Sequence, residues 1–69
     1  METIETEILK IYQDSFRKAV KLCQENGMKM KILSEQDIPF NQVRIKVETE
    51  SAHDFYHLGK TFGTLRQEV

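Results

Sequence analysis

Residues 43–48, with the sequence VRIKVE, alternate strictly between apolar and charged side chains. Alternation with period two places the two kinds of side chain on opposite faces of a strand, so a half-buried strand is predicted over residues 43–49. Ser51 follows with a side-chain oxygen suited to capping a helix, and Asp54 stands three residues later in an acidic variant of the capping box. The sequence therefore predicts a strand that leads directly into a capped helix.

The apolar positions change to helical spacing after this cap, and a helix is predicted from about Ala52 to near the carboxyl end. Its apolar stripe consists of Phe55, Leu58, Phe62, Leu65 and Val69. Gly59 and Gly63 stand on one flank of this helix, where each costs up to about 1 kcal/mol relative to alanine. The preferred interpretation is close packing against another backbone, within the chain or between two copies. The alternative is an early fraying end with Gly63 as the cap.

The residues before this stretch predict a first helix, a stop signal and another strand. The apolar residues between Ile4 and Cys23 share one arc of about 180° when placed on a helix, which predicts a helix over residues 3–26. Asn26 and Gly27 form its stop signal. A strand is predicted over 28–34 and a connection over 35–42. Such a short link suits an antiparallel hairpin better than a parallel crossover, which needs about a dozen residues or more.

The expected fold is a single α+β domain over residues 1–69, in the order helix, strand, strand, helix. Both amphipathic helices pack on one face of the antiparallel hairpin, which is marginally stable alone and too narrow to cover two wide apolar stripes. Cys23 is the only cysteine, so no internal disulfide can supply the missing stability. We therefore expect a homodimer that completes the fold through strand edges or helix packing. The self-association residues are predicted to be Phe55, Gly59, Phe62 and Gly63.

Composition and charge favour a cytoplasmic domain. The net charge is −1 and 30% of the residues are charged, which argues against a strongly cationic nucleic-acid binder. The acidic amino end lacks the basic start of a secretory or mitochondrial leader. No apolar run approaches the length of a membrane span, so no membrane partner is expected.

The outer face of the predicted hairpin is basic. Lys29, Lys31, Arg44 and Lys46 fall on this face, and cations on adjacent strands repel one another. One interpretation is contact with a nucleic-acid phosphate backbone. No aromatic residue is interleaved among the cations to stack on bases, so a solubilising face is the preferred interpretation.

The histidines and the cysteine predict neither an active site nor a metal site. His53 and His57 share a helix face with the spacing of a metalloprotease motif, but Asp54 replaces the general-base glutamate and no third ligand is evident. Solvated surface histidines are the preferred interpretation. Cys23 lies in the apolar arc of the first predicted helix, where a free cysteine packs as a small hydrophobe. No catalytic residue, metal or cofactor is therefore predicted.

These features predict a small non-catalytic domain that self-associates and acts as a protein-interaction or regulatory module. The alternative is a nucleic-acid-binding domain that uses the basic outer face of the hairpin. Phe40 and Tyr56, at the borders of apolar faces, are the first candidates for contacts with a protein partner. Their mutation should abolish binding to a protein partner, whereas neutralising the basic face should abolish binding to nucleic acid.

Overall fold

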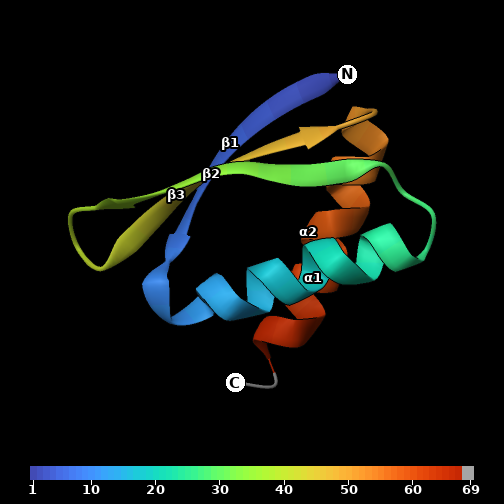
Figure 1. Cartoon of the computed structure of the whole chain (residues 1–69). Coiled ribbons are helices and arrows are strands. Elements are labelled where there is room, and N and C mark those ends of the chain that lie inside the picture. Colours follow the sequence, from blue (N-terminus) through green and yellow to red (C-terminus); the bar gives the residue numbers. More distant parts are fainter. Residues whose placement is uncertain (68–69) are drawn as a thin grey trace.

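The computed structural model describes residues 1–67 and contains a three-stranded antiparallel sheet with two helices packed on one face (Figure 1). The predicted α+β fold class is therefore confirmed. In chain order the elements are β1 (Glu2–Leu9), the 3-10 turn η1 (Lys10–Tyr12), α1 (Gln13–Glu25), β2 (Met30–Ile38), β3 (Gln42–Thr49) and α2 (Ala52–Arg66). Val69, the last member of the predicted helix stripe, lies outside the described residues.

The helix predicted over residues 3–26 is wrong in its first third, where the chain forms strand β1. Ile4 and Ile8 fit helical spacing, but together with Thr6 they also alternate with polar residues, so both periods match. Their β-branched side chains favour an extended backbone. Pairing with β3 selects the strand, since β1 is in register with it from Glu2 opposite Thr49 to Leu9 opposite Gln42. The order of elements is therefore strand, helix, strand, strand, helix.

Strand β3 is the centre of the sheet, whose strand order is β1-β3-β2. Both neighbours are antiparallel to β3, so β1 and β2 run parallel to each other and α1 connects them past the central strand. This is a split βαβ arrangement. Val43, Ile45 and Val47 of β3 are 0% exposed, which confirms the half-buried strand predicted from its alternating sequence.

The predicted signals at the helix ends are also confirmed. Gly27 has a φ of +88° and follows α1 in a Schellman motif, in which its N–H donates to the Gln24 carbonyl and the Met28 N–H donates to the Cys23 carbonyl. At the start of α2, the Asp54 N–H donates to Ser51 Oγ over 3.3 Å. Local sequence thus fixes where α1 ends and where α2 begins.

The hairpin between β2 and β3 is tighter than the predicted connection over residues 35–42. Strand β2 continues to Ile38, so only residues 39–41 form the turn, and Phe40 and Asn41 both have positive φ values of 68° and 55°. The register of β2 shifts between Ile32 and Ser34, which marks a β-bulge. The hairpin itself, with antiparallel strands, is as predicted.

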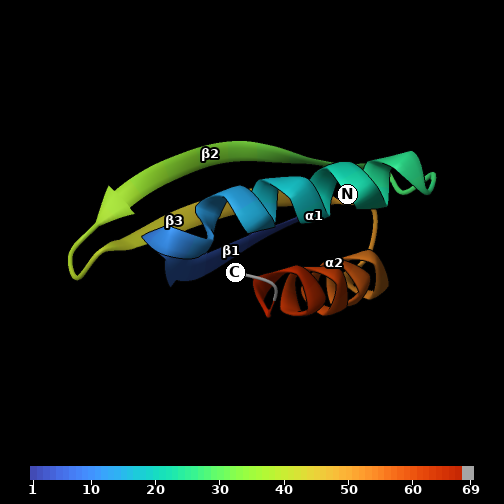
Figure 2. The ribbon, with the colours of Figure 1, turned by 90° about the horizontal axis from the view of Figure 1, so that it is seen from below.

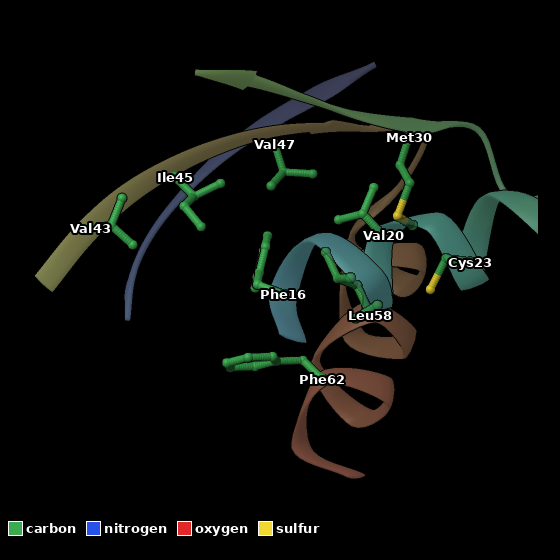
Figure 3. Close-up of a cluster of buried hydrophobic side chains, with 10 residues drawn as sticks. Phe16, Val20, Cys23, Met30, Val43, Ile45, Val47, Leu58 and Phe62 are labelled. Carbon is green, nitrogen blue, oxygen red and sulfur yellow. The ribbon is translucent and has the colours of Figure 1, made fainter. Parts of the chain in front are cut away.

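The core lies between β3 and the two helices (Figure 3). Phe16 and Val20 of α1 meet Leu58 and Phe62 of α2 beneath the valines and isoleucine of β3. The ring of Phe62 packs edge-to-face against Phe16, with centroids 5.3 Å apart. One chain therefore builds a buried core that joins both helices to the sheet.

The third strand changes the basis of the homodimer prediction. That prediction assumed that the chain supplies only a two-stranded hairpin, whereas β1 adds a strand from the same chain. The sheet has one strand more than the sequence predicted, so it leaves less of the helix surface uncovered. In the part of the chain that the structure describes, β1 and β2 remain open edges. Dimer formation stays a prediction.

Candidate interaction surface

Helix α2 lies on the β1 side of α1, with α1 between it and β2 (Figure 2). Asp54 and Thr61 of α2 lie near the thiol of Cys23 in α1, which places this side of α2 toward α1. Residues are spaced by about 100° around a helix, so the opposite flank carries Ala52, Phe55, Gly59 and Gly63. This flank faces away from α1, toward the side where the sheet ends at β1.

The flank of α2 is open and apolar. A shallow groove on it is lined by Ala52, Phe55, Tyr56, Gly59 and Lys60. Tyr56 is 62% exposed, and Lys60 Nζ lies 5.3 Å from the centre of its ring, within range of a cation–π interaction. A Cβ atom added at Gly59 or Gly63 would meet no described atom within 4 Å beyond its chain neighbours and the adjacent backbone of its own helix. The glycines therefore make no close packing contact within one chain.

The four predicted self-association residues do not share one surface. Gly59 and Gly63 lie along the open flank of α2, Phe55 lines its groove but also packs against the core, and Phe62 is only 9% exposed and belongs to the core. Gly63 is not a helix cap, because α2 continues to Arg66. The role of the flank in self-association stays a prediction, and the direction of Phe62 depended on where the sheet lies.

The free edge of β1 lies on the same side of α1 as this flank (Figure 2). Glu7, Ile8 and Leu9 of β1 line a hollow together with Phe62 and Arg66 of α2, so the end of the helix lies beneath the end of the strand. The inward side chains of β1 are only half-buried, in contrast to the fully buried ones of β3. We call the free edge of β1 together with Ala52, Phe55, Tyr56 and Gly59 of α2 the β1–α2 surface.

The outer face of the sheet, opposite the helices, is balanced in charge. Arg44 Nη2 lies 2.9 Å from Glu7 Oε2, and Lys31 Nζ lies 3.9 Å from Glu48 Oε1. Lys46 stands opposite Glu5 in the register of β1 and β3. Lys31, Arg44 and Lys46 are thus brought together as predicted, but each has a carboxylate beside it. Lys29 precedes β2, and it lines a separate hollow with Lys31 and Glu48.

Exposed apolar side chains at the hairpin end of the sheet were not predicted from the sequence. Leu9 and Ile11 were assigned to the buried arc of a helix, but both are exposed, and Phe40 at the turn is 88% exposed. The Lys10 N–H donates to the Asn41 carbonyl over 2.7 Å, which holds the end of β1 against the turn. The positive φ of Phe40 is strained for a bulky side chain. The one sequence signal for the exposure of Leu9 is the alternation of β1, which places Leu9 on the same face as Glu5 and Glu7.

His53, His57 and Cys23 do not form a chemical centre in the described residues. The two imidazole rings lie 4.8 Å apart on α2, and no group of three or more metal-ligating side chains occurs in residues 1–67. Cys23 is buried in the core, and this burial raises the pKa of its thiol. A buried neutral thiol is a poor nucleophile.

Two further findings bear on the candidate surface. None of the helices in the described part of the chain is long and apolar enough to cross a membrane. Comparisons with protein-family models, with curated proteins and with solved structures found no match to this chain.

Proposed function

We propose that the chain is a small non-catalytic protein-interaction module whose partner binds at the β1–α2 surface. The observation that carries this proposal is that, in the described residues, an unpaired strand edge and an open apolar helix flank lie on the same side of α1. The strand edge offers a row of backbone N–H and C=O groups, and the flank offers apolar area that a partner can remove from water. Strand addition to an open sheet edge is a common mode of peptide recognition.

The lining of the groove supports binding rather than catalysis. Its walls are apolar apart from Lys60 and the hydroxyl of Tyr56. Exposed aromatic residues such as Tyr56 are enriched among the residues that supply most of the energy of protein interfaces. Lys60 lies over this ring within range of a cation–π interaction.

The homodimer expected from the sequence is one form of this proposal. Two copies would bring Phe55, Gly59 and Gly63 of each α2 together, and the missing glycine side chains would allow the helices to approach closely. Phe62 has no part in such an interface because it is buried in the core.

Nucleic-acid binding through Lys29, Lys31, Arg44 and Lys46 has less support. Binding to a phosphate backbone needs a surface with excess positive charge. On the outer face of the sheet, Glu5, Glu7 and Glu48 lie among the cations and offset them.

Affinity capture from an extract of cells that make the protein tests the proposal when it compares matched variants. Gly59→Arg places a long charged side chain on the open flank, and Thr64→Arg places the same side chain at another exposed position of α2. We expect a protein that is retained by the wild type and by Thr64→Arg but not by Gly59→Arg. Equal retention by all forms would contradict the proposed surface, and loss after nuclease treatment would favour the nucleic-acid alternative. Circular dichroism verifies that each variant is folded.

A further inference from the structure

We propose that the free edge of β1 binds an extended segment of a partner protein as a fourth strand, and that this segment alternates basic with apolar residues. This inference rests on the proposed function and specifies the chemistry of the partner. The basic side chains lie on the outer face of the sheet, beside Glu5 and Glu7. The apolar side chains point inward, over the open flank of α2.

The two edges of the sheet differ in how well they are protected against strand addition. Strand β2 is interrupted by a bulge between Ile32 and Ser34 and carries Lys31, and both features discourage pairing with another strand. Strand β1 has neither lysine nor proline, and its register with β3 is continuous over Glu2–Leu9. The edge at β1 is therefore regular enough to accept a strand along its whole length.

The charges of β1 select a basic partner strand. Glu5 and Glu7 project from the outer face, with Lys46 and Arg44 opposite them on the β3 side. Both hydrogen-bonding contacts from Arg44 reach Glu7 Oε2, so the second carboxylate oxygen remains available to another cation. Side chains of an added strand would stand about 5 Å from those of β1, where opposite charges attract and like charges repel.

The inward face of the same added strand would meet apolar surface. Ile4 and Ile8 of β1 are half-buried, so an adjacent strand would cover more of their area. The groove of α2 lies on the same side of α1, and the absence of a side chain at Gly59 leaves room there for a residue of the partner. Because successive side chains of a strand point to opposite faces, an alternating segment satisfies both surfaces at once.

A second copy of β1 fits this edge poorly. A two-fold axis would pair the two β1 strands antiparallel, with residues of the same sheet face opposite each other. Near the middle of the strand, such registers place Glu5 opposite Glu5 or Glu7, or Glu7 opposite Glu7. Like charges directly opposite each other are destabilising. The acidic strand therefore favours a basic partner over a copy of itself.

The experiment uses isotope-labelled full chain and three synthetic peptides in NMR titrations. The first peptide alternates lysine and valine, the second has the same composition in two blocks, and the third is the alternating peptide with N-methyl groups on every second amide. We expect the alternating peptide to shift the amides of β1 and of the α2 flank and to slow hydrogen exchange along β1. The block peptide cannot match both faces, and the N-methylated peptide cannot complete the backbone ladder, so both should bind at least about tenfold more weakly.

Charge variants of the chain complete the test. The double variant Glu5→Lys/Glu7→Lys should weaken binding of the alternating peptide by about tenfold or more, whereas Glu25→Lys, at an exposed position on α1, should change it little. Equal binding of all three peptides would overturn the strand proposal. Shifts confined to the α2 flank, or a dimer found by sedimentation that the peptide does not dissociate, would also overturn it while leaving the β1–α2 surface as an interaction site. Shifts on neither β1 nor α2 would overturn the strand proposal, while the affinity capture with Gly59→Arg and Thr64→Arg decides the β1–α2 surface separately.

Discussion

Glu7 and Arg44 face each other across β1 and β3, with Glu7 Oε2 2.9 Å from Arg44 Nη2 and 3.0 Å from Arg44 Nε. This pair joins the amino-terminal strand to the central strand on the outer face of the sheet. Together with Glu5 opposite Lys46, it turns a face that is basic on β3 into one of balanced charge. The two carboxylates of β1 therefore offset the positive charge of β3 on the outer face, although β1 is only the edge strand of the sheet.

The first prediction concerns nucleic acid. We expect the wild type to produce no salt-dependent change in the anisotropy of a fluorescent DNA or RNA oligonucleotide, because the carboxylates of β1 offset the cations of β3. The double variant Glu5→Gln/Glu7→Gln removes the negative charges beside Arg44 and Lys46, so it should bind the oligonucleotide weakly at low salt. Wild-type binding that disappears on neutralisation of Arg44 and Lys46 would instead support the nucleic-acid alternative.

Local sequence predicted the elements whose signals are unambiguous. The alternation in residues 43–48, the cap at Ser51 and the stop at Gly27 each correspond to one structure, and all three are confirmed. Residues 2–9 were different, since Ile4 and Ile8 satisfy the periods of a helix and of a strand. The choice between them depends on pairing with residues about forty positions later in the chain, which local periodicity does not contain.

The candidate surface was predictable only in part for the same reason. The spacing of Gly59 and Gly63 identified an unusual helix flank, and this flank is open in the structure. A helical projection gives the relative directions of side chains but not the position of the sheet, so Phe62 was wrongly grouped with the glycines. The free edge of β1 could not be predicted while these residues were assigned to a helix.

The second prediction separates Phe62 from Tyr56. Phe62→Ala removes a buried ring that packs on Phe16, so it should lower the free energy of unfolding by about 3–5 kcal/mol. A small domain has only about 5–15 kcal/mol in total, so this loss is a large part of its stability. Tyr56→Ala, at an exposed position, should change the free energy by about 0.5 kcal/mol or less. Urea denaturation measures both, and similar losses in the two variants would contradict the assignment of Phe62 to the core.

The third prediction concerns Gly59. The glycine spacing predicts a closely packed flank, but a Cβ atom at Gly59 meets no described atom within 4 Å beyond its chain neighbours and the adjacent backbone of its own helix. Gly59→Ala should therefore raise the free energy of unfolding of one chain by about 0.5–1 kcal/mol through better helix propensity. Gly27→Ala is the matched control, and it should be destabilising because Gly27 has a φ of +88°. A loss of stability in Gly59→Ala would show that the flank is packed in solution, as it would be in a dimer.

The fourth prediction concerns the thiol of Cys23. Its side chain is buried against α2, and desolvation raises the pKa of the thiol, which keeps it in the unreactive protonated form. In native protein near neutral pH, reaction with a disulfide reagent should be slow and should accelerate sharply across the urea transition. Ser34→Cys adds a thiol at an exposed position of β2 as a control that reacts without unfolding. Rapid modification of Cys23 at full native stability would contradict its burial.

The last prediction concerns the link between α1 and the outer part of β2. Arg17 Nε donates to Glu35 Oε1 over 2.9 Å and Arg17 Nη2 donates to Glu35 Oε2 over 3.1 Å, while Gln13 Nε2 also donates to Oε1. These bonds lower the pKa of Glu35 below its usual value, with the hydrogen bond from Arg17 as the main cause. The unfolded chain therefore binds a proton at Glu35 at higher pH than the folded chain does.

The sign of the pH dependence follows from this difference. The stabilisation is fully present above the unfolded pKa of about 4.3 and is lost as the pH falls through the lower folded pKa. Glu35→Gln should be less stable than the wild type at neutral pH, and the two urea midpoints should converge as the pH falls below about 4. Asp14→Asn is the matched control, since Asp14 contacts the same guanidinium over 3.2 Å but is almost fully exposed, and its effect should be smaller. A difference between wild type and Glu35→Gln that stays constant with pH would show that the carboxylate charge does not hold β2 to α1.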